Sequence, residues 1–212
     1  MVRVKICGIT NVEDALLACE LGADAIGLNF YSESPRCISP FMASKIIRNL
    51  TPFVAPVGIF VNWDASPVTT LAKALGLSAV QLHGDEAPKL VGEIAKEVPV
   101  IKALHVVKGS ALLPFAKYRA ATAFLLDAPH SGQYGGTGKT ADWGAAHTAA
   151  KSHRILLAGG LTPENVAEAI LAVRPYAVDV TSGVESKPGK KDPAKLRAFF
   201  EAVARANQQL CP

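Results

Sequence analysis

VRVKICGITNVEDALLACELGADAIGLNF, residues 2–30, predicts a strand, a loop, a helix and a second strand. VRVKI at 2–6 and AIGLNF at 25–30 are short apolar runs of the kind that form buried strands. Between them, VEDALLACELG at 12–22 has apolar residues at helical spacing and ends on Gly22, which suits a helix C-cap. A parallel βαβ unit is therefore expected at the start of the chain.

The same alternation continues along the chain. The further candidate strands are PVGIFV at 56–61, AVQLH at 79–83, PVIKAL at 99–104, AFLLD at 123–127, RILLA at 154–158 and AVDVT at 177–181. Helical patterns between them include SPVTTLAKALG at 66–76, EAPKLVGEIAKE at 86–97 and PENVAEAILAV at 163–173. Eight strands in 212 residues give about 26 residues per unit, the scale of βα repeats. The pattern favours one (β/α)8 TIM-barrel domain over residues 1–212 rather than an open doubly wound sheet.

The composition predicts a compact protein of a reducing compartment. Hydrophobic residues make up 50% of the chain and charged residues 19%. The net charge is +4, and the one basic cluster, KPGKK at 187–191, is interpreted as a solvated loop, so nucleic-acid binding is not expected. The four cysteines have no CxxC spacing, which argues against a zinc site and a disulfide framework. Without a signal-like segment or an apolar run of about 20 residues, the expected location is cytoplasmic, away from membranes.

Cys7 follows the first predicted strand, and the loops after the strands form the active-site face of such a barrel. Strand alternation places Lys5 and Cys7 toward the barrel interior, where a lysine needs a partner. Asp179, in the last strand, has the same inward phase, so a Lys5–Asp179 pair is predicted. The cation of Lys5 is also expected to favour the reactive thiolate of Cys7. Cys7 is then either a small buried hydrophobe or a catalytic residue.

Other polar residues end predicted strands. Asp127 is either a loop-bonding group or a catalytic acid or base, and it is expected to face Cys7 from the opposite side of the barrel mouth. Gln81 and His83 share an inward phase, and His83 is either a satisfied loop histidine or a substrate contact. Arg36 is either a solvated surface charge or a bidentate clamp for a carboxylate.

Two glycine-containing loops follow the seventh and eighth strands. LAGGLTPEN at 157–165 and TSGVES at 181–186 are either ordinary tight turns or a phosphate site, which barrels commonly build from these two loops. The residues expected to bind phosphate are Gly159, Gly160, Ser182 and Gly183.

GQYGGTGKT at 132–140 looks superficially like a Walker A loop. Gln133 stands where that motif requires its first glycine, and the stretch follows the sixth strand rather than the first. A loop that closes over the mouth beside Asp127 is expected instead.

The motifs KICGIT, SPR, QLHG, LLDAP, GGTGKTADW, LAGGL and DVTSGVE occur in the order found in phosphoribosylanthranilate isomerases of tryptophan biosynthesis, which the chain resembles over essentially its whole length. The resemblance implies a (β/α)8 barrel without metal or organic cofactor. It implies an Amadori rearrangement of a small phosphorylated substrate, with Cys7 as general base and Asp127 as general acid. Arg36 would hold the anthranilate carboxylate, and the glycine loops the ribose phosphate. Monomer and homodimer both stay open.

Two positions depart from the family pattern: Ala141 replaces an expected aromatic residue, and Cys37 an expected bulkier one. Two alternatives also remain. A related phosphosugar isomerase of histidine biosynthesis would have a carboxylate in place of Cys7. A catalytically silent barrel would bind a phosphorylated ligand without turning it over.

Overall fold

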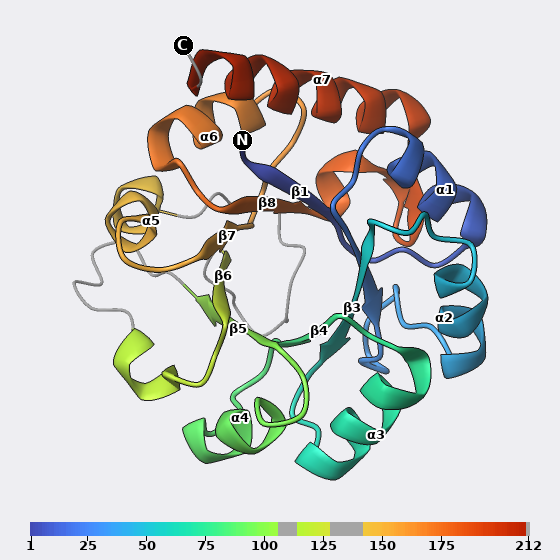
Figure 1. Ribbon diagram of the computed structural model, residues 1–212. Helices are drawn as coiled ribbons and strands as arrows, with labels where there is room; N and C mark the ends of the chain where they lie inside the picture. The colour runs from blue at the N-terminus through green and yellow to red at the C-terminus, as the bar shows by residue number, and fades with distance from the viewer. Residues whose placement is uncertain (106–113, 128–141, 211–212) are drawn as a thin grey trace.

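The computed structural model describes residues 1–105, 114–127 and 142–210. Within these residues, eight parallel strands form a closed barrel in sequence order, with β1 pairing β8 (Figure 1). The strands are β1 (Arg3–Ile6), β2 (Ala25–Asn29), β3 (Ala55–Phe60), β4 (Ala79–Leu82), β5 (Val100–His105), β6 (Ala123–Asp127), β7 (Ile155–Leu157) and β8 (Ala177–Val180). Each overlaps a run that the sequence predicted to be a strand, with ends that differ by at most one residue, so the predicted barrel is confirmed.

Helices surround the barrel (Figure 1). In the described residues they are α1 (Val12–Glu20), α2 (Pro40–Ile47), α3 (Ala65–Leu75), α4 (Pro88–Ile94), α5 (Trp143–Ala150), α6 (Val166–Val173) and α7 (Pro193–Leu210), with 3-10 turns η1 (Phe115–Tyr118) and η2 (Ser182–Val184). The described part of the β5–β6 connection contains η1 and no α-helix. None of the described helices is both long and apolar enough to span a membrane.

Strand alternation divides the apolar side chains into two cores. One lies between the strands and the helices and includes Val4, Ile6, Val178 and Val180. The other fills the barrel itself with residues such as Val57, Ile101, Leu125 and Leu156. This division agrees with the predicted phase of the first and last strands.

The pairing of β1 with β8 brings Lys5 opposite Asp179. Lys5 Nζ donates to Asp179 Oδ1 at 2.8 Å, and both side chains are buried. The predicted ion pair is therefore confirmed.

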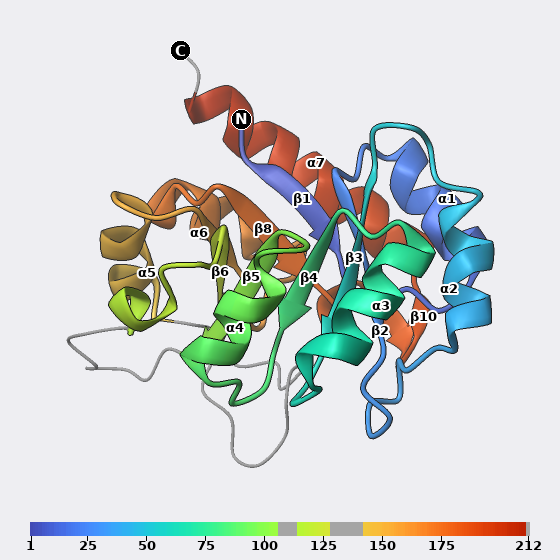
Figure 2. The same ribbon diagram turned by 60° about the horizontal axis from the view of Figure 1, so that its bottom comes forward.

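Helix α7 lies beside the start of β1 (Figure 2). The side chain of Asn207 in α7 accepts from the N–H of Val2 and donates to the carbonyl oxygen of Val2.

A two-stranded antiparallel hairpin, β9 (Glu185–Lys187) and β10 (Lys190–Lys191), follows η2. The interpretation of 187–191 as a solvated loop is wrong for Lys191, whose side chain is fully buried. Its ammonium is satisfied by protein oxygens, so burial is tolerated without exposure to water.

Candidate functional site

A pocket at the C-terminal ends of the strands collects every residue for which the sequence suggests a role in catalysis or binding. Its volume is about 730 Å³, counting the part open to solvent. The lining includes Cys7, Arg36, Gln81, His83, Asp127, Gly159, Gly160, Ser182 and Gly183. The pocket therefore lies where the loop-face rule for such barrels predicts it.

Cys7 is the first residue after β1, and two nearby glycines leave space for pocket side chains. Its backbone N–H donates to Val180 O at 2.9 Å, which fixes it to the end of β8. Gly8 has φ +70°, and a Cβ there would lie 2.5 Å from Cδ of Arg36. A Cβ on Gly27 of β2 would lie 2.9 Å from Cys7 Sγ. Gly27 thus leaves space for the thiol, and Gly8 leaves space for the side chain of Arg36.

The pKa of the Cys7 thiol is raised above its ordinary value, mainly by burial. The cations of Lys5 and Lys191 act in the opposite direction, while the carboxylate of Asp179 adds to the increase. Lys5 thus favours the thiolate, as expected, but burial outweighs it. Burial also lowers the pKa of the Lys191 ammonium, against the opposing effects of Glu185 and Cys7.

Asp127 ends β6 and is buried beside His83. Its Oδ2 lies 3.5 Å from His83 Nε2, and His83 Nδ1 lies 2.9 Å from Gln81 Nε2. In the closed ring, β7 and β8 separate β6 from β1, so β5 rather than β6 is the strand opposite β1. The expectation that Asp127 faces Cys7 from directly across the mouth is therefore wrong, although both line the same pocket.

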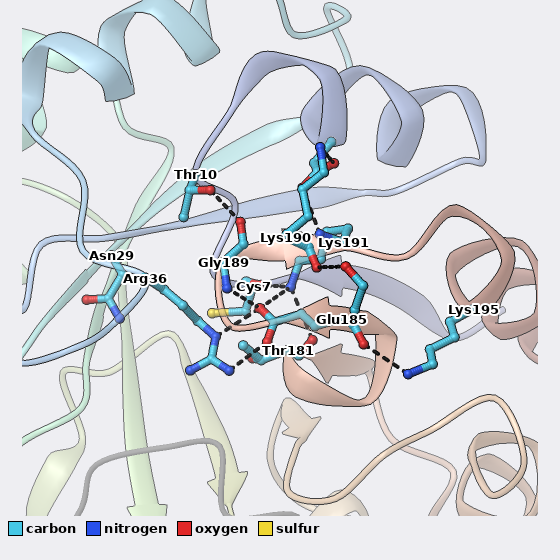
Figure 3. A network of polar contacts seen from close by, with 12 residues as sticks. Cys7, Thr10, Asn29, Arg36, Thr181, Glu185, Gly189, Lys190, Lys191 and Lys195 are labelled. Carbon is cyan, nitrogen blue, oxygen red and sulfur yellow. Dashed lines mark hydrogen bonds and ion pairs between the residues drawn. The ribbon is translucent and has the colours of Figure 1, made fainter.

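Arg36, on the loop after β2, makes a bidentate ion pair with a carboxylate of the protein itself. Its Nε donates to Glu185 Oε1 at 2.9 Å and its Nη2 to Glu185 Oε2 at 2.6 Å (Figure 3). This hydrogen bonding raises the pKa of Arg36. The alternative of a solvated surface charge is wrong, because the side chain is only 13% exposed. A guanidinium has five N–H groups, so three remain beyond the two that Glu185 accepts.

The two glycine loops touch each other at the pocket. Gly159 and Gly160 both have positive φ, at +82° and +61°. A Cβ on Gly183 would overlap the carbonyl oxygen of Leu161 in the neighbouring loop. The side chain of Asn165 donates to Gly160 O at 2.9 Å and accepts from the N–H of Thr162 at 2.8 Å. This close packing exceeds what two independent tight turns require.

Several pocket residues were not suggested by the sequence. Asn29, Tyr31 and Ser34 line the pocket beside Arg36, and Asn29 Nδ2 donates to Ser34 Oγ at 3.1 Å. Asn29 ends β2, and Tyr31 and Ser34 lie in the loop after it, whose ordinary composition did not single them out. Glu185 lies within a quoted motif, but its bond to Arg36 spans 149 residues, which local patterns do not indicate.

Some expectations fall on other parts of the chain. The segment 132–140, its closing motion and Ala141 lie outside the described residues. Cys37 is exposed and pairs through a single β-bridge with Asn29. Across the described ranges, no group of three or more His, Cys, Asp or Glu side chains is arranged to hold a metal ion.

Comparison with known proteins gives one family. The family model described as N-(5'phosphoribosyl)anthranilate (PRA) isomerase matches residues 4–202. An N-(5'-phosphoribosyl)anthranilate isomerase of Pelobacter propionicus is 52% identical, with 99% of each chain covered. The crystal structure of phosphoribosyl anthranilate isomerase from Thermotoga maritima is 47% identical, with a TM-score of 0.90 over 97% of this chain and 100% of that one.

A further solved structure of such an isomerase contains reduced 1-(o-carboxyphenylamino)-1-deoxyribulose 5-phosphate. It is 44% identical to this chain, with a TM-score of 0.86 over 97% of this chain and 100% of that one. Both similarities therefore extend over nearly the whole length of this chain.

Proposed function

The chain belongs to the family of N-(5'-phosphoribosyl)anthranilate isomerases, and from this premise we propose that Cys7 is its general base and Asp127 its general acid. The reaction is the Amadori rearrangement of N-(5-phosphoribosyl)anthranilate to 1-(2-carboxyphenylamino)-1-deoxyribulose 5-phosphate, in tryptophan biosynthesis. The observation that carries the proposal is that a thiol and a carboxyl group, at the ends of different strands, line one pocket.

The rearrangement needs one proton delivered and one removed. Asp127 protonates the ribose ring oxygen, so the ring opens to a Schiff base. Cys7 then takes the C2′ proton, which gives an enolamine that becomes the ketone. The placement of Asp127 supports this assignment, because its carboxyl group is buried at the pocket with Oδ2 3.5 Å from His83 Nε2.

Burial of Cys7 has two opposite effects on its action as a base. The raised pKa makes the thiolate rarer at neutral pH, but it also makes each thiolate a stronger base toward a C–H group. Lys5 and Lys191 limit the first effect. The reacting form is therefore the minority thiolate.

We further propose that the substrate is held at both ends. Arg36 offers its remaining N–H groups to the anthranilate carboxylate, on the side of the pocket next to Cys7. Gly159, Gly160, Ser182 and Gly183 hold the ribose phosphate through backbone N–H groups and the serine hydroxyl. Gln81 and His83 contact the substrate between these ends. Anchoring both ends places the reacting carbons between the acid and the base.

The two alternatives predict different outcomes. A histidine-pathway isomerase expects a carboxylate in place of Cys7, and the chain has a thiol there. A catalytically silent barrel would bind the substrate without converting it, which turnover measurements distinguish directly.

The proposed roles are tested with Cys7→Ser and Asp127→Asn. Each is expected to lower kcat by about a hundredfold or more, because each removes a proton-transfer group, while product binding measured by calorimetry persists. A variant with nearly normal kcat would remove its residue from the mechanism. Arg36→Ala should mainly raise KM, and an unchanged KM would contradict the carboxylate clamp.

We also propose that one domain spans residues 1–212 and that the protein works in the cytoplasm. The free thiols of Cys7, Cys19 and Cys37 suit a reducing compartment. One copy of the chain supplies all the proposed site residues, so both a monomer and a homodimer are compatible with activity. Sedimentation at micromolar concentration would separate the two states.

A further inference from the structure

We propose that Glu185 and Lys191, both in the β9–β10 hairpin, are positioning residues. Glu185 holds the guanidinium of Arg36 in place, and Lys191 holds together the ends of β1 and β8, beside Cys7. This inference rests on the proposed function, because it assigns the two residues to the support of Arg36 and Cys7. Neither residue lines the pocket.

The carboxylate of Glu185 is fully occupied by the protein. Among the described residues, Oε1 accepts from Arg36 Nε at 2.9 Å, Lys191 Nζ at 3.1 Å and the Gly189 N–H at 3.2 Å, while Oε2 accepts from Arg36 Nη2 at 2.6 Å. All four contacts come from the protein, and the buried Glu185 does not line the pocket, so its carboxylate does not meet a substrate. Glu185 can therefore influence the reaction only through the groups that it holds.

The ammonium of Lys191 is occupied in the same way. Nζ donates to Cys7 O at 2.7 Å, Thr181 O at 3.1 Å and Glu185 Oε1 at 3.1 Å, which uses its three N–H groups within the described chain (Figure 3). Cys7 and Thr181 are the first residues after β1 and β8. Lys191 thus joins the ends of the two strands at which the barrel closes, next to the proposed base.

The hairpin that carries both residues is itself fixed. The Lys191 N–H donates to Asp14 Oδ2 at 2.8 Å, and Lys190 Nζ lies 3.6 Å from Asp14 Oδ1. Thr10 donates to the carbonyl oxygen of Gly189, which has φ +78° at the turn (Figure 3). The hairpin is therefore attached to the segment that runs from Cys7 into α1.

This arrangement fixes the side chain of Arg36 and keeps the charge around it positive. An arginine side chain loses conformational entropy when it is fixed in one rotamer. Because Glu185 already fixes Arg36 in the free protein, this entropy is not lost again when the substrate binds. Arg36 and Lys191 together exceed the single negative charge of Glu185, so the cluster stays net positive toward an incoming carboxylate. Without Lys191, the pair would be neutral.

The test uses Lys191→Met with Lys102→Met as the matched control. Lys102 is an equally buried lysine that donates to two carbonyl oxygens, of Leu82 and Gly84, and to the carboxylate of Glu86. It belongs to β5, on the far side of the barrel from β1. Both substitutions remove a buried ammonium, but only Lys191 contacts Cys7 and Glu185, the partner of Arg36.

Two quantities are measured on folded variants. One is KM for phosphoribosylanthranilate, and the other is the pH midpoint of Cys7 alkylation by iodoacetamide, followed by mass spectrometry of the peptide that carries Cys7. Lys191→Met should raise KM about tenfold and move the midpoint to higher pH, because a cation near the thiolate is lost. Lys102→Met should leave the midpoint in place. An unchanged KM and midpoint in Lys191→Met, or an equal shift in Lys102→Met, would overturn the inference.

Glu185→Gln supplies a second test that does not depend on the folding of Lys191→Met. It should raise KM by a similar factor without moving the alkylation midpoint to higher pH, because it removes a negative charge rather than a positive one. General damage to the site would move the alkylation midpoint to higher pH in both variants, which would contradict the separate roles. An unchanged KM in Glu185→Gln would contradict them as well. An inactive wild-type protein would instead overturn the proposed function, and the alkylation midpoints would still test Lys191.

Discussion

The thiol of Cys7 has charged neighbours on several elements, namely Lys5 on β1, Asp179 on β8, Lys191 on β10 and Arg36 on the loop after β2. Burial raises its pKa in spite of the cations, and a base acts only when it has lost its proton. We therefore expect kcat/KM to increase as the pH rises from about 7 to about 9, in step with the thiolate fraction. A pH profile that is flat or falls over this range would contradict the assignment of Cys7 as the base.

The space beside Cys7 gives a second prediction at this scale. In Gly27→Ala the new methyl group would lie 2.9 Å from Cys7 Sγ and 3.1 Å from Ile59 Cδ1, so the thiol must shift. We expect kcat to fall about tenfold or more, because proton transfer depends on sub-ångström placement. Gly92→Ala in α4 is the control, since nothing lies within 4 Å of its new methyl group. Equal kcat in both variants would show that the position of the thiol is not constrained by Gly27.

Residues at strand ends could be predicted from the sequence, whereas the residues that support them could not. Cys7 and Asp127 stand out because each is a polar or reactive residue directly after a buried apolar run. Lys191 sits among lysines and glycine in a cluster whose composition is that of a solvated loop. Its burial depends on acceptors at Cys7 and Thr181, and no local pattern contains that information.

At the scale of elements, the buried Lys5–Asp179 pair joins β1 to β8 where the barrel closes. Lys5→Met leaves the buried carboxylate of Asp179 without its partner, and we expect a loss of about 3–5 kcal/mol in the free energy of unfolding, measured with urea. Lys73→Met removes the cation of an exposed ion pair and should change the unfolding midpoint little. Similar midpoints for the two variants would show that Asp179 finds another partner.

This pair was predictable because it follows from two simple rules: the last strand of a barrel lies beside the first, and side chains alternate between its faces. The hairpin β9–β10 was not predictable in the same way. Its strands have three and two residues, too short for an alternating pattern to be recognised. Its stability comes instead from contacts with Asp14 and Thr10, which lie more than 170 residues away in the sequence.

At the scale of the whole molecule, the barrel brings chain segments from both ends of the sequence to one pocket. The regular alternation of strands and helices made this architecture predictable, because it leaves few topologies open. The position of Asp127 around the ring differs from the prediction: it lies at the end of β6, whereas β5 is opposite β1. In a closed ring of eight strands the opposite strand is four positions along, so Asp127 lies one strand to the side of the position across from Cys7.

The most direct test is to mix freshly made phosphoribosylanthranilate with the wild-type protein and with Cys7→Ser, and to follow formation of the rearranged product. We expect rapid turnover by the wild type and almost none by the variant, which lacks a group able to take the C2′ proton. Comparable product formation by both proteins would contradict the role of Cys7 as the base, and no turnover by the wild type would contradict the isomerase itself.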